Sequence, residues 1–305
     1  MINKVLIIGE AGVNHNCSLE NAKKLILAGA EAGVDYVKFQ TFKANKLVSK
    51  DAKKADYQKI NTKDENTSQF EMLKKLEMPE SWHHELIKYA ELLNVKFLST
   101  GFDEESIDFL DSINIDLFKI PSGEITNKPF LEHIAKKKKQ IIVSTGMANL
   151  EEVRAAIEVL QNNGIQKNYI TILHCNTEYP TPMQDVNLLA MNTIKNELGV
   201  QVGYSDHTLG IEVPIAAVAL GAVLIEKHFT LDRNMVGPDH LASLTPEELK
   251  QMVISIRNIQ LAISGNGIKE ASYSEKKNIN IEKILRISIN IENQIHKSSQ
   301  TIAPL

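Results

Sequence analysis

Two histidines in the C-terminal half of the chain each follow a short apolar run, and 21 residues separate them. His207 follows the run 202–204, His228 follows the run 222–225, and an alanine-rich segment of helical length lies between the runs. If the runs are parallel strands joined by a helix, both imidazoles lie at the same edge of one sheet. Neighbouring imidazoles with carboxylates nearby are typical of a site for a divalent metal ion. A histidine at a strand end can also be purely structural, and the pattern leaves both interpretations open.

Polar side chains also follow the other apolar runs, and their types suit anionic groups and hydroxyl groups. Lysines and serines near glycine turns suit phosphate and carboxylate groups, and the candidates are Lys38, Lys119, Ser122, Ser144 and Ser205. Carboxylates suit sugar hydroxyls or proton transfer, and the candidates are Glu10, Glu124 and Asp239. Each type also has a simpler role, because a serine can cap a helix and a lysine can pair with a glutamate. Together, so many polar groups at strand ends indicate a polar ligand.

Eight strand-plus-helix units place these side chains. The strands are predicted near residues 5, 36, 96, 117, 140, 170, 202 and 222. Helices are predicted between them and after the last, including 80–93, 104–112, 128–135, 150–162, 186–198 and 246–263. Eight such units predict a (β/α)8 TIM barrel, in which sites gather at the carboxyl ends of the strands. The alternative, an open doubly wound sheet, usually carries a glycine-rich phosphate turn that GEAGVNHN at 9–16 lacks.

Two segments do not follow this alternation. Residues 43–78 are too long for an ordinary loop, and we interpret them as an insertion with a short helix on the side of the strand ends. The end of the chain is rich in Asn, Ile, Lys and Ser, and the alternation at 285–291 predicts one strand. We therefore predict a barrel domain over 1–265 and a separate tail over 266–305.

Composition excludes several classes of protein. The net charge of −4 gives no reason to expect a nucleic acid or an anionic membrane as a partner. Two cysteines, Cys17 and Cys175, do not form a disulfide framework and suit a reducing compartment. No leader pattern and no apolar run of membrane-spanning length is visible. We expect a cytoplasmic protein with no nucleic-acid or membrane partner.

Seven segments of the chain carry a family resemblance. They are GEAGVNHN at 9–16, VKFQTF at 37–42, FKIPSGEI at 118–125, VSTGMA at 143–148, LHCNTEYPTP at 173–182, VGYSDHT at 202–208 and IEKHFTLDRNMVGPDH at 225–240. In this order they resemble the bacterial sialic acid synthase family, which includes N-acetylneuraminate synthase and N,N'-diacetyllegionaminate synthase. The resemblance covers the chain from about residue 5 to about residue 280.

The resemblance implies an enzyme that condenses phosphoenolpyruvate with an N-acylated mannosamine-type sugar and water. The sugar would be N-acetylmannosamine or 2,4-diacetamido-2,4,6-trideoxymannose, and C–O cleavage would release phosphate and a nonulosonic acid. By motif, the catalytic residues would be Glu10, Lys38, Lys119, Glu124, His207 and His228, the two histidines binding Mn²⁺ or Mg²⁺. The substrate-binding residues would be Gln40, Ser122, Ser144, Thr177, Tyr179, Ser205 and Asp239.

The resemblance also implies an assembly and an appended domain. Members of the family form homodimers and carry a C-terminal antifreeze-like domain, and residues 266–305 resemble the linker and the start of that domain without completing it. Two other functions stay open at this point. One is a Schiff-base aldolase or lyase that uses Lys119 or Lys38 as its nucleophile. The other is a barrel that binds these ligands without turnover.

Overall fold

The computed structural model describes residues 4–64 and 68–299. The chain divides into two compact units, Met1–Ile263 and Ser264–Leu305. Within the described residues, none of the helices combines the length and the apolar character needed to cross a membrane.

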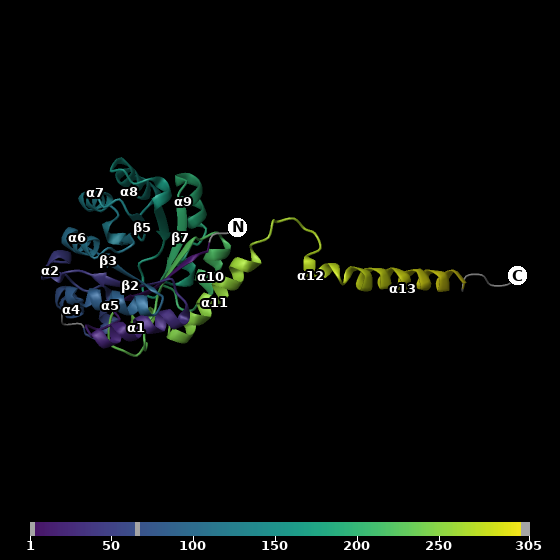
Figure 1. Cartoon of the computed structure of the whole chain (residues 1–305), viewed down its shortest axis with the longest axis horizontal. Coiled ribbons are helices and arrows are strands. Elements are labelled where there is room, and N and C mark those ends of the chain that lie inside the picture. The colour runs from purple at the N-terminus through teal and green to yellow at the C-terminus, as the bar shows by residue number, and fades with distance from the viewer. Residues whose placement is uncertain (1–3, 65–67, 300–305) are drawn as a thin grey trace. The chain divides into compact units, whose positions relative to one another are not determined.

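Eight parallel strands form the centre of the first unit, with the hydrogen-bonded order β3-β2-β1-β8-β7-β6-β5-β4. The strands are β1 (Leu6–Gly12), β2 (Tyr36–Thr41), β3 (Lys96–Gly101), β4 (Leu117–Ile120), β5 (Gln140–Ser144), β6 (Ile170–His174), β7 (Gln201–Asp206) and β8 (Leu224–His228). The two end strands, β3 and β4, lie against each other, so the sheet curves into a nearly closed barrel. Figure 1 shows helices around these strands. The predicted TIM barrel and its eight strands are confirmed.

The helices between the strands match the predicted ranges closely. They are α1 (Leu19–Ala32), α5 (Glu80–Leu92), α6 (Glu104–Ser112), α7 (Lys128–Ala135), α8 (Leu150–Asn162), α9 (Ala190–Leu198), α10 (Glu212–Ala219) and α11 (Pro246–Ala262). Side-chain caps begin α1, α6, α7, α8 and α11, and at α1 the Ser18 hydroxyl accepts a hydrogen bond from the amide of Asn21 at 3.3 Å. Helix α9 begins later than predicted, because Met183–Asp185 forms a 3₁₀ turn and Asn187 has a positive φ of 46°.

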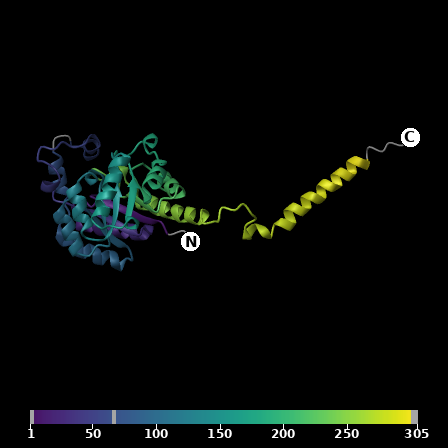
Figure 2. The same ribbon diagram turned by 90° about the horizontal axis from the view of Figure 1, so that it is seen from above.

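The insertion contains three short helices rather than the one predicted. They are α2 (Ala44–Leu47), α3 (Asp56–Thr62) and α4 (Gln69–Leu76). Helix α4 packs Met72 and Leu76 against Val13 and Phe42, which forms a small second core. The insertion, dark blue in Figure 2, therefore has its own packing beside the barrel.

The second unit contains α12 (Tyr273–Lys276) and α13 (Ile279–Ser299). The strand predicted at 285–291 is wrong, because these residues lie within α13. The apolar residues at 281, 284, 285, 291 and 295 also follow helical spacing, and a helix satisfies its own backbone hydrogen bonds without a partner strand. The antifreeze-like character of residues 266–305 stays a prediction.

Candidate active site

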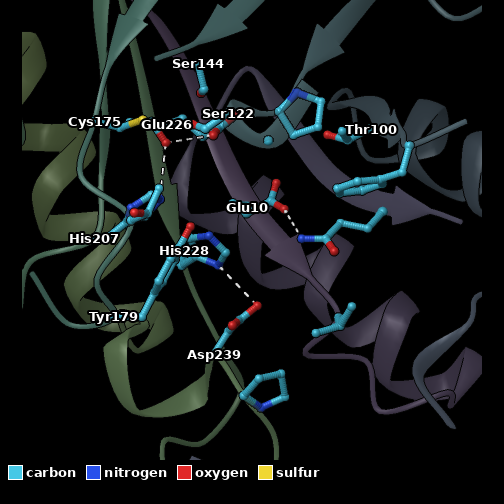
Figure 3. Close-up of a pocket in the computed structure, with 18 of the residues that line it drawn as sticks. Glu10, Thr100, Ser122, Ser144, Cys175, Tyr179, His207, Glu226, His228 and Asp239 are labelled. Atoms are coloured by element: carbon cyan, nitrogen blue, oxygen red, sulfur yellow. Dashed lines mark hydrogen bonds and ion pairs between the residues drawn. The ribbon is translucent and has the colours of Figure 1, made fainter. Parts of the chain in front are cut away.

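A cavity of about 440 Å³ opens at the carboxyl ends of the barrel strands. It brings together every predicted site residue except Glu124. These are Glu10, Lys38, Gln40, Lys119, Ser122, Ser144, Thr177, Tyr179, Ser205, His207, His228 and Asp239. Figure 3 shows several of them pointing toward a common centre. The barrel therefore gathers residues that lie more than two hundred positions apart in the sequence.

The pleat of β7 and β8 decides which side chains enter the cavity. Successive strand residues point to opposite faces, so Glu226 and His228 face inward while Lys227 faces away. Ser205 on β7 pairs with Glu226, and Glu10 on β1 pairs with His228. Parallel register thus places a serine, two glutamates and an imidazole side by side.

Four buried charges occupy the floor of the cavity, and their sum is zero. Both carboxylate oxygens of Glu226 contact the Nζ of Lys119, at 2.7 and 3.0 Å. The Nζ of Lys38 lies 2.6 Å from Oε2 of Glu10 and 3.5 Å from Oε2 of Glu226. Ser205 donates a hydrogen bond of 2.8 Å to Glu226. Glu226 is therefore the common partner of three groups that suit an anionic ligand.

Burial and mutual attraction give the four charged groups different proton affinities. Burial raises the pKa of Glu10 to about 7, although the charge of Lys38 opposes the increase. Burial would also raise the pKa of Glu226, but Lys119 and Lys38 outweigh it and hold that pKa well below its usual range. Burial lowers the pKa of Lys119, whereas the two carboxylates outweigh burial at Lys38 and raise its pKa. Glu10 is therefore the carboxyl group of this network that can exchange a proton near neutral pH.

A glycine packs against two residues that line the neighbouring part of the cavity, Ser122 and Thr177. The amide of Gly146 donates a hydrogen bond of 3.0 Å to the Ser122 hydroxyl. A Cβ added at Gly146 would lie 2.5 Å from Cγ2 of Thr177 and 2.9 Å from the Ser122 oxygen. Ser144, at the end of β5, is buried beside them. Only glycine fits here without displacing Thr177 or Ser122, both of which line the cavity.

The two histidines are neighbours, as their spacing predicts, with ring centroids 5.4 Å apart. Burial lowers the pKa of His207 to about 4 and that of His228 well below its ordinary value, so both rings are neutral. The Nδ1–H of His207 donates to the carbonyl of Asn176, which leaves its Nε2 as the acceptor nitrogen. Nδ1 of His228 is buried without a hydrogen bond and lies 4.0 Å from the Asp239 carboxylate.

This donor set fits a divalent ion only in part. Two neutral imidazoles, one of them oriented by a backbone carbonyl, are the arrangement that metal ligands require. Among residues 4–64 and 68–299, however, no group of three or more histidine, cysteine or acidic side chains could hold a metal ion. A bound ion would therefore take its remaining ligands from water or substrate.

An aromatic column covers the histidine pair. The ring of Tyr179 stacks on His207 with centroids 4.0 Å apart and meets His228 edge-on at 5.6 Å. Tyr57 from α3 also stacks on Tyr179, with centroids 5.2 Å apart. The insertion therefore contributes directly to the wall of the site.

Glu124 lies outside this cavity. Its carboxylate accepts a hydrogen bond of 2.6 Å from Asn127 and lines a smaller cavity of about 230 Å³ together with Lys46 and Asp103. The short 3₁₀ turn Ser122–Glu124 separates the two, because it directs Ser122 into the main cavity and not Glu124. A catalytic role for Glu124 stays a prediction.

Three cavity residues that contact the predicted site residues were not among them. Glu226 shares a strand face with His228, and period-two alternation was the signal that could have assigned it. Thr100 accepts a hydrogen bond of 2.9 Å from Lys38. The only sequence signal for Thr100 was a hydroxyl side chain at the end of a predicted strand. Tyr57 had no signal, because the insertion has no regular period.

Comparisons with known proteins match most of this chain. The sequence profile of the NeuB family matches residues 25–269. The N,N'-diacetyllegionaminic acid synthase of Campylobacter jejuni is 57% identical over 280 residues, which covers 92% of this chain and 83% of the relative. The enzyme of the same name from Legionella pneumophila is 51% identical over 297 residues, covering 96% and 82%.

A solved structure shares the fold. The N-acetylneuraminic acid (sialic acid) synthetase of Leptospira borgpetersenii, crystallised with citrate, superposes with a TM-score of 0.80 at 32% identity. The match covers 93% of both chains. The resemblance inferred from the motifs is confirmed.

Proposed function

This chain belongs to the NeuB family, and on that premise we propose that it condenses phosphoenolpyruvate with an N-acylated mannosamine-type sugar and water. The two bacterial relatives are named for N,N'-diacetyllegionaminic acid, so the proposed sugar is 2,4-diacetamido-2,4,6-trideoxymannose. The proposal rests on one observation: a single cavity is lined by two buried lysines, three serines and a pair of imidazoles. The products would be a nine-carbon 2-keto acid and phosphate.

The lysines and serines suit the two anionic ends of phosphoenolpyruvate. Lys119 lies with Ser122, Ser144 and Ser205 in the cavity, where ammonium and hydroxyl donors would hold the phosphate. Lys38 and Thr100, which contact each other at 2.9 Å, would hold the carboxylate. In this arrangement an entering anion would share both lysines with Glu226 and Glu10.

The reaction balances with the groups present. Carbon 3 of phosphoenolpyruvate attacks the aldehyde carbon of the open-chain sugar, and the aldehyde oxygen takes a proton. Water adds to carbon 2 and loses a proton, which leaves a hydroxyl group there. The C–O bond to phosphate then breaks, and the hydroxyl loses its proton to become the keto group of the product. Glu10, whose pKa burial raises to about 7, is the group that we infer holds or accepts a proton beside the reacting atoms.

A divalent ion, Mn²⁺ or Mg²⁺, is part of the proposal. His207 and His228 would hold it, and when bound it would polarise the sugar aldehyde as a Lewis acid. By analogy with the family, we also propose a homodimer that works in the cytoplasm.

Phosphate release from phosphoenolpyruvate tests the function. It would be measured with Mn²⁺ and without sugar, then with N-acetylmannosamine, then with the 2,4-diacetamido sugar. We expect release only when a sugar is present, and fastest with the diacetamido sugar. If neither sugar releases phosphate while calorimetry still detects binding of phosphoenolpyruvate, the chain binds its ligand without turnover and the proposed function is wrong.

One observation favours the Schiff-base alternative. Burial lowers the pKa of Lys119, which is the usual way to activate a lysine nucleophile. The double contact with Glu226 opposes this, because it favours the ammonium form. Borohydride reduction in the presence of pyruvate separates the two mechanisms. A covalent adduct on Lys119 would support the lyase, and an unlabelled chain would support the synthase.

A further inference from the structure

Helices α3 and α4 of the insertion form one wall of the cavity, and we call them the arm. The arm is attached to the barrel at two points near the sugar side of the site. Tyr57 stacks on Tyr179 with an angle of 29° between the ring planes. The side-chain amide of the buried Asn61 donates a hydrogen bond of 2.6 Å to the carbonyl of Pro238, next to Asp239.

These contacts place the arm away from the phosphate-binding groups. In Figure 3, Tyr179 and Asp239 lie on the opposite side of Glu10 from Ser144. Burial raises the pKa of Tyr57, and the nearby charge of Asp239 raises it further, which agrees with this position. A ligand between the lysines and the imidazoles would therefore present its sugar portion to the arm.

The surface that the arm presents has a distinct chemistry. It consists of the aromatic ring of Tyr57, three aliphatic side chains and two amides, namely Met72, Leu73, Leu76, Gln58 and Gln69. Within its described residues the arm has several charged side chains, and none of them lines the cavity. The Gln58 oxygen already accepts a hydrogen bond of 2.9 Å from the Ala55 amide, so this glutamine is held in place.

We propose that the arm determines which sugar the enzyme accepts, by binding acetamido and methyl groups in preference to hydroxyl groups. This inference rests on the proposed function. The diacetamido-trideoxy sugar replaces the 4-hydroxyl of N-acetylmannosamine by an acetamido group and its hydroxymethyl group by a methyl group. Aliphatic side chains bury the methyl groups, and the glutamine amides suit the added amide. A hydroxyl group against the aliphatic part of this wall loses water without gaining a partner.

The size of the effect follows from known apolar pockets. One methylene in such a pocket changes the specificity ratio by roughly 10- to 200-fold. The quantity to measure is the ratio of kcat/KM for the diacetamido sugar to kcat/KM for N-acetylmannosamine, at saturating phosphoenolpyruvate.

Two variants of the arm test the proposal. Leu73→Gln makes the wall polar at a half-buried position, and we expect the kcat/KM ratio to fall about tenfold or more. Tyr57→Ala removes the ring that faces Tyr179, with a fall in the same direction. Leu73→Met keeps the wall apolar and should keep most of the preference. Ile60→Gln is the matched control, because Ile60 lies on α3, is 70% exposed and does not line the cavity.

The outcomes separate this inference from the proposed function. An unchanged ratio in both Leu73→Gln and Tyr57→Ala, or equal losses with both sugars, would overturn the role of the arm. If the unmodified protein releases no phosphate, sugar binding is measured by calorimetry on the same variants. If the unmodified protein binds the diacetamido sugar more tightly than N-acetylmannosamine and the arm variants lose this preference, the inference is supported although the proposed function fails. Binding of neither sugar would overturn both.

Discussion

Lys227 and Asp206 form an ion pair directly behind the two histidines, with 2.5 Å between Nζ and Oδ2 and no exposure of either side chain. Both residues point away from the cavity, while their neighbours His228 and His207 line it. Lys227 also donates to the carbonyl of Thr208. The pair therefore connects the ends of β7 and β8 from behind the site.

Removing one partner of this pair should destabilise the protein strongly. Lys227→Met leaves the Asp206 carboxylate buried without its cation, which costs about 3–5 kcal/mol of unfolding free energy. Urea denaturation checks this. Lys128→Met is the control, because Lys128 faces Glu132 at 3.8 Å with 70% of its side chain exposed, and such a pair contributes about 0–1 kcal/mol. Equal losses in the two variants would contradict the structural role.

Glu226 orients the two lysines, so its neutral analogue should affect turnover more than binding. Glu226→Gln removes one negative charge beside Lys119 and Lys38, which should leave the KM for phosphoenolpyruvate unchanged or lower it. Misplacement of the lysines by about 1 Å should lower kcat by about 10²-fold. Glu178→Gln, an exposed change at the same rim, is the control. A raised KM with normal kcat would show that Glu226 serves binding alone.

Gly146 should tolerate no side chain. The new Cβ of Gly146→Ala would displace Thr177 or Ser122, at a cost of about 1–3 kcal/mol in stability and with a higher KM for phosphoenolpyruvate. Thermal unfolding and steady-state kinetics measure the two effects. Gly123→Ala is the comparison for stability, because a Cβ there meets no atom within 4 Å. If Gly146→Ala is as stable as Gly123→Ala and binds phosphoenolpyruvate normally, the short contacts of the added Cβ with Thr177 and Ser122 affect neither stability nor binding.

A buried histidine that does not line the cavity should make the protein sensitive to acid. His83 is fully buried, its Nε2 lies 2.8 Å from the Thr41 hydroxyl, and burial lowers its pKa to about 4. In the unfolded chain its pKa is near 6.5, so only the unfolded state gains a proton between these values. The contribution of His83 to stability should be constant above pH 6.5 and fall by at most about 1.4 kcal/mol per pH unit down to about pH 4.

The variant His83→Gln isolates this contribution. It keeps a polar contact near Thr41 and cannot titrate, so its unfolding free energy should depend less on pH across that range. His84→Gln changes an exposed neighbour and serves as the control. An identical pH slope in His83→Gln and the unmodified protein would show that other groups cause the acid sensitivity.

Removal of divalent ions should stop turnover without unfolding the barrel. A chelator should abolish phosphate release, and added Mn²⁺ should restore it. His207→Gln and His228→Gln should each weaken Mn²⁺ binding by about 10-fold or more, measured by calorimetry, since each removes one of two protein ligands. His84→Gln is again the control. Full activity in the presence of the chelator would remove the metal from the proposal.

Local patterns were sufficient for most of the barrel. Short β-rich runs predicted all eight strands, and apolar residues at helical spacing predicted the helices between them. Both patterns are visible in the sequence because each strand or helix buries residues that recur at the spacing of its own geometry. The motifs at the strand ends also predicted which residues would meet, since parallel strands bring their carboxyl ends to one rim. The prediction of a strand at 285–291 was wrong because the apolar residues there fit both strand alternation and helical spacing. The local pattern alone therefore did not distinguish a strand from a helix.

The sequence by itself determined the barrel, the rim on which the site lies and the imidazole pair, because these follow from element periods and parallel order. Only the tertiary structure decided that Glu226 joins both lysines, that Glu124 faces another cavity and that Tyr57 stacks on Tyr179. These are contacts between side chains distant in the sequence or at irregular turns. Their geometry depends on packing, which no local period encodes.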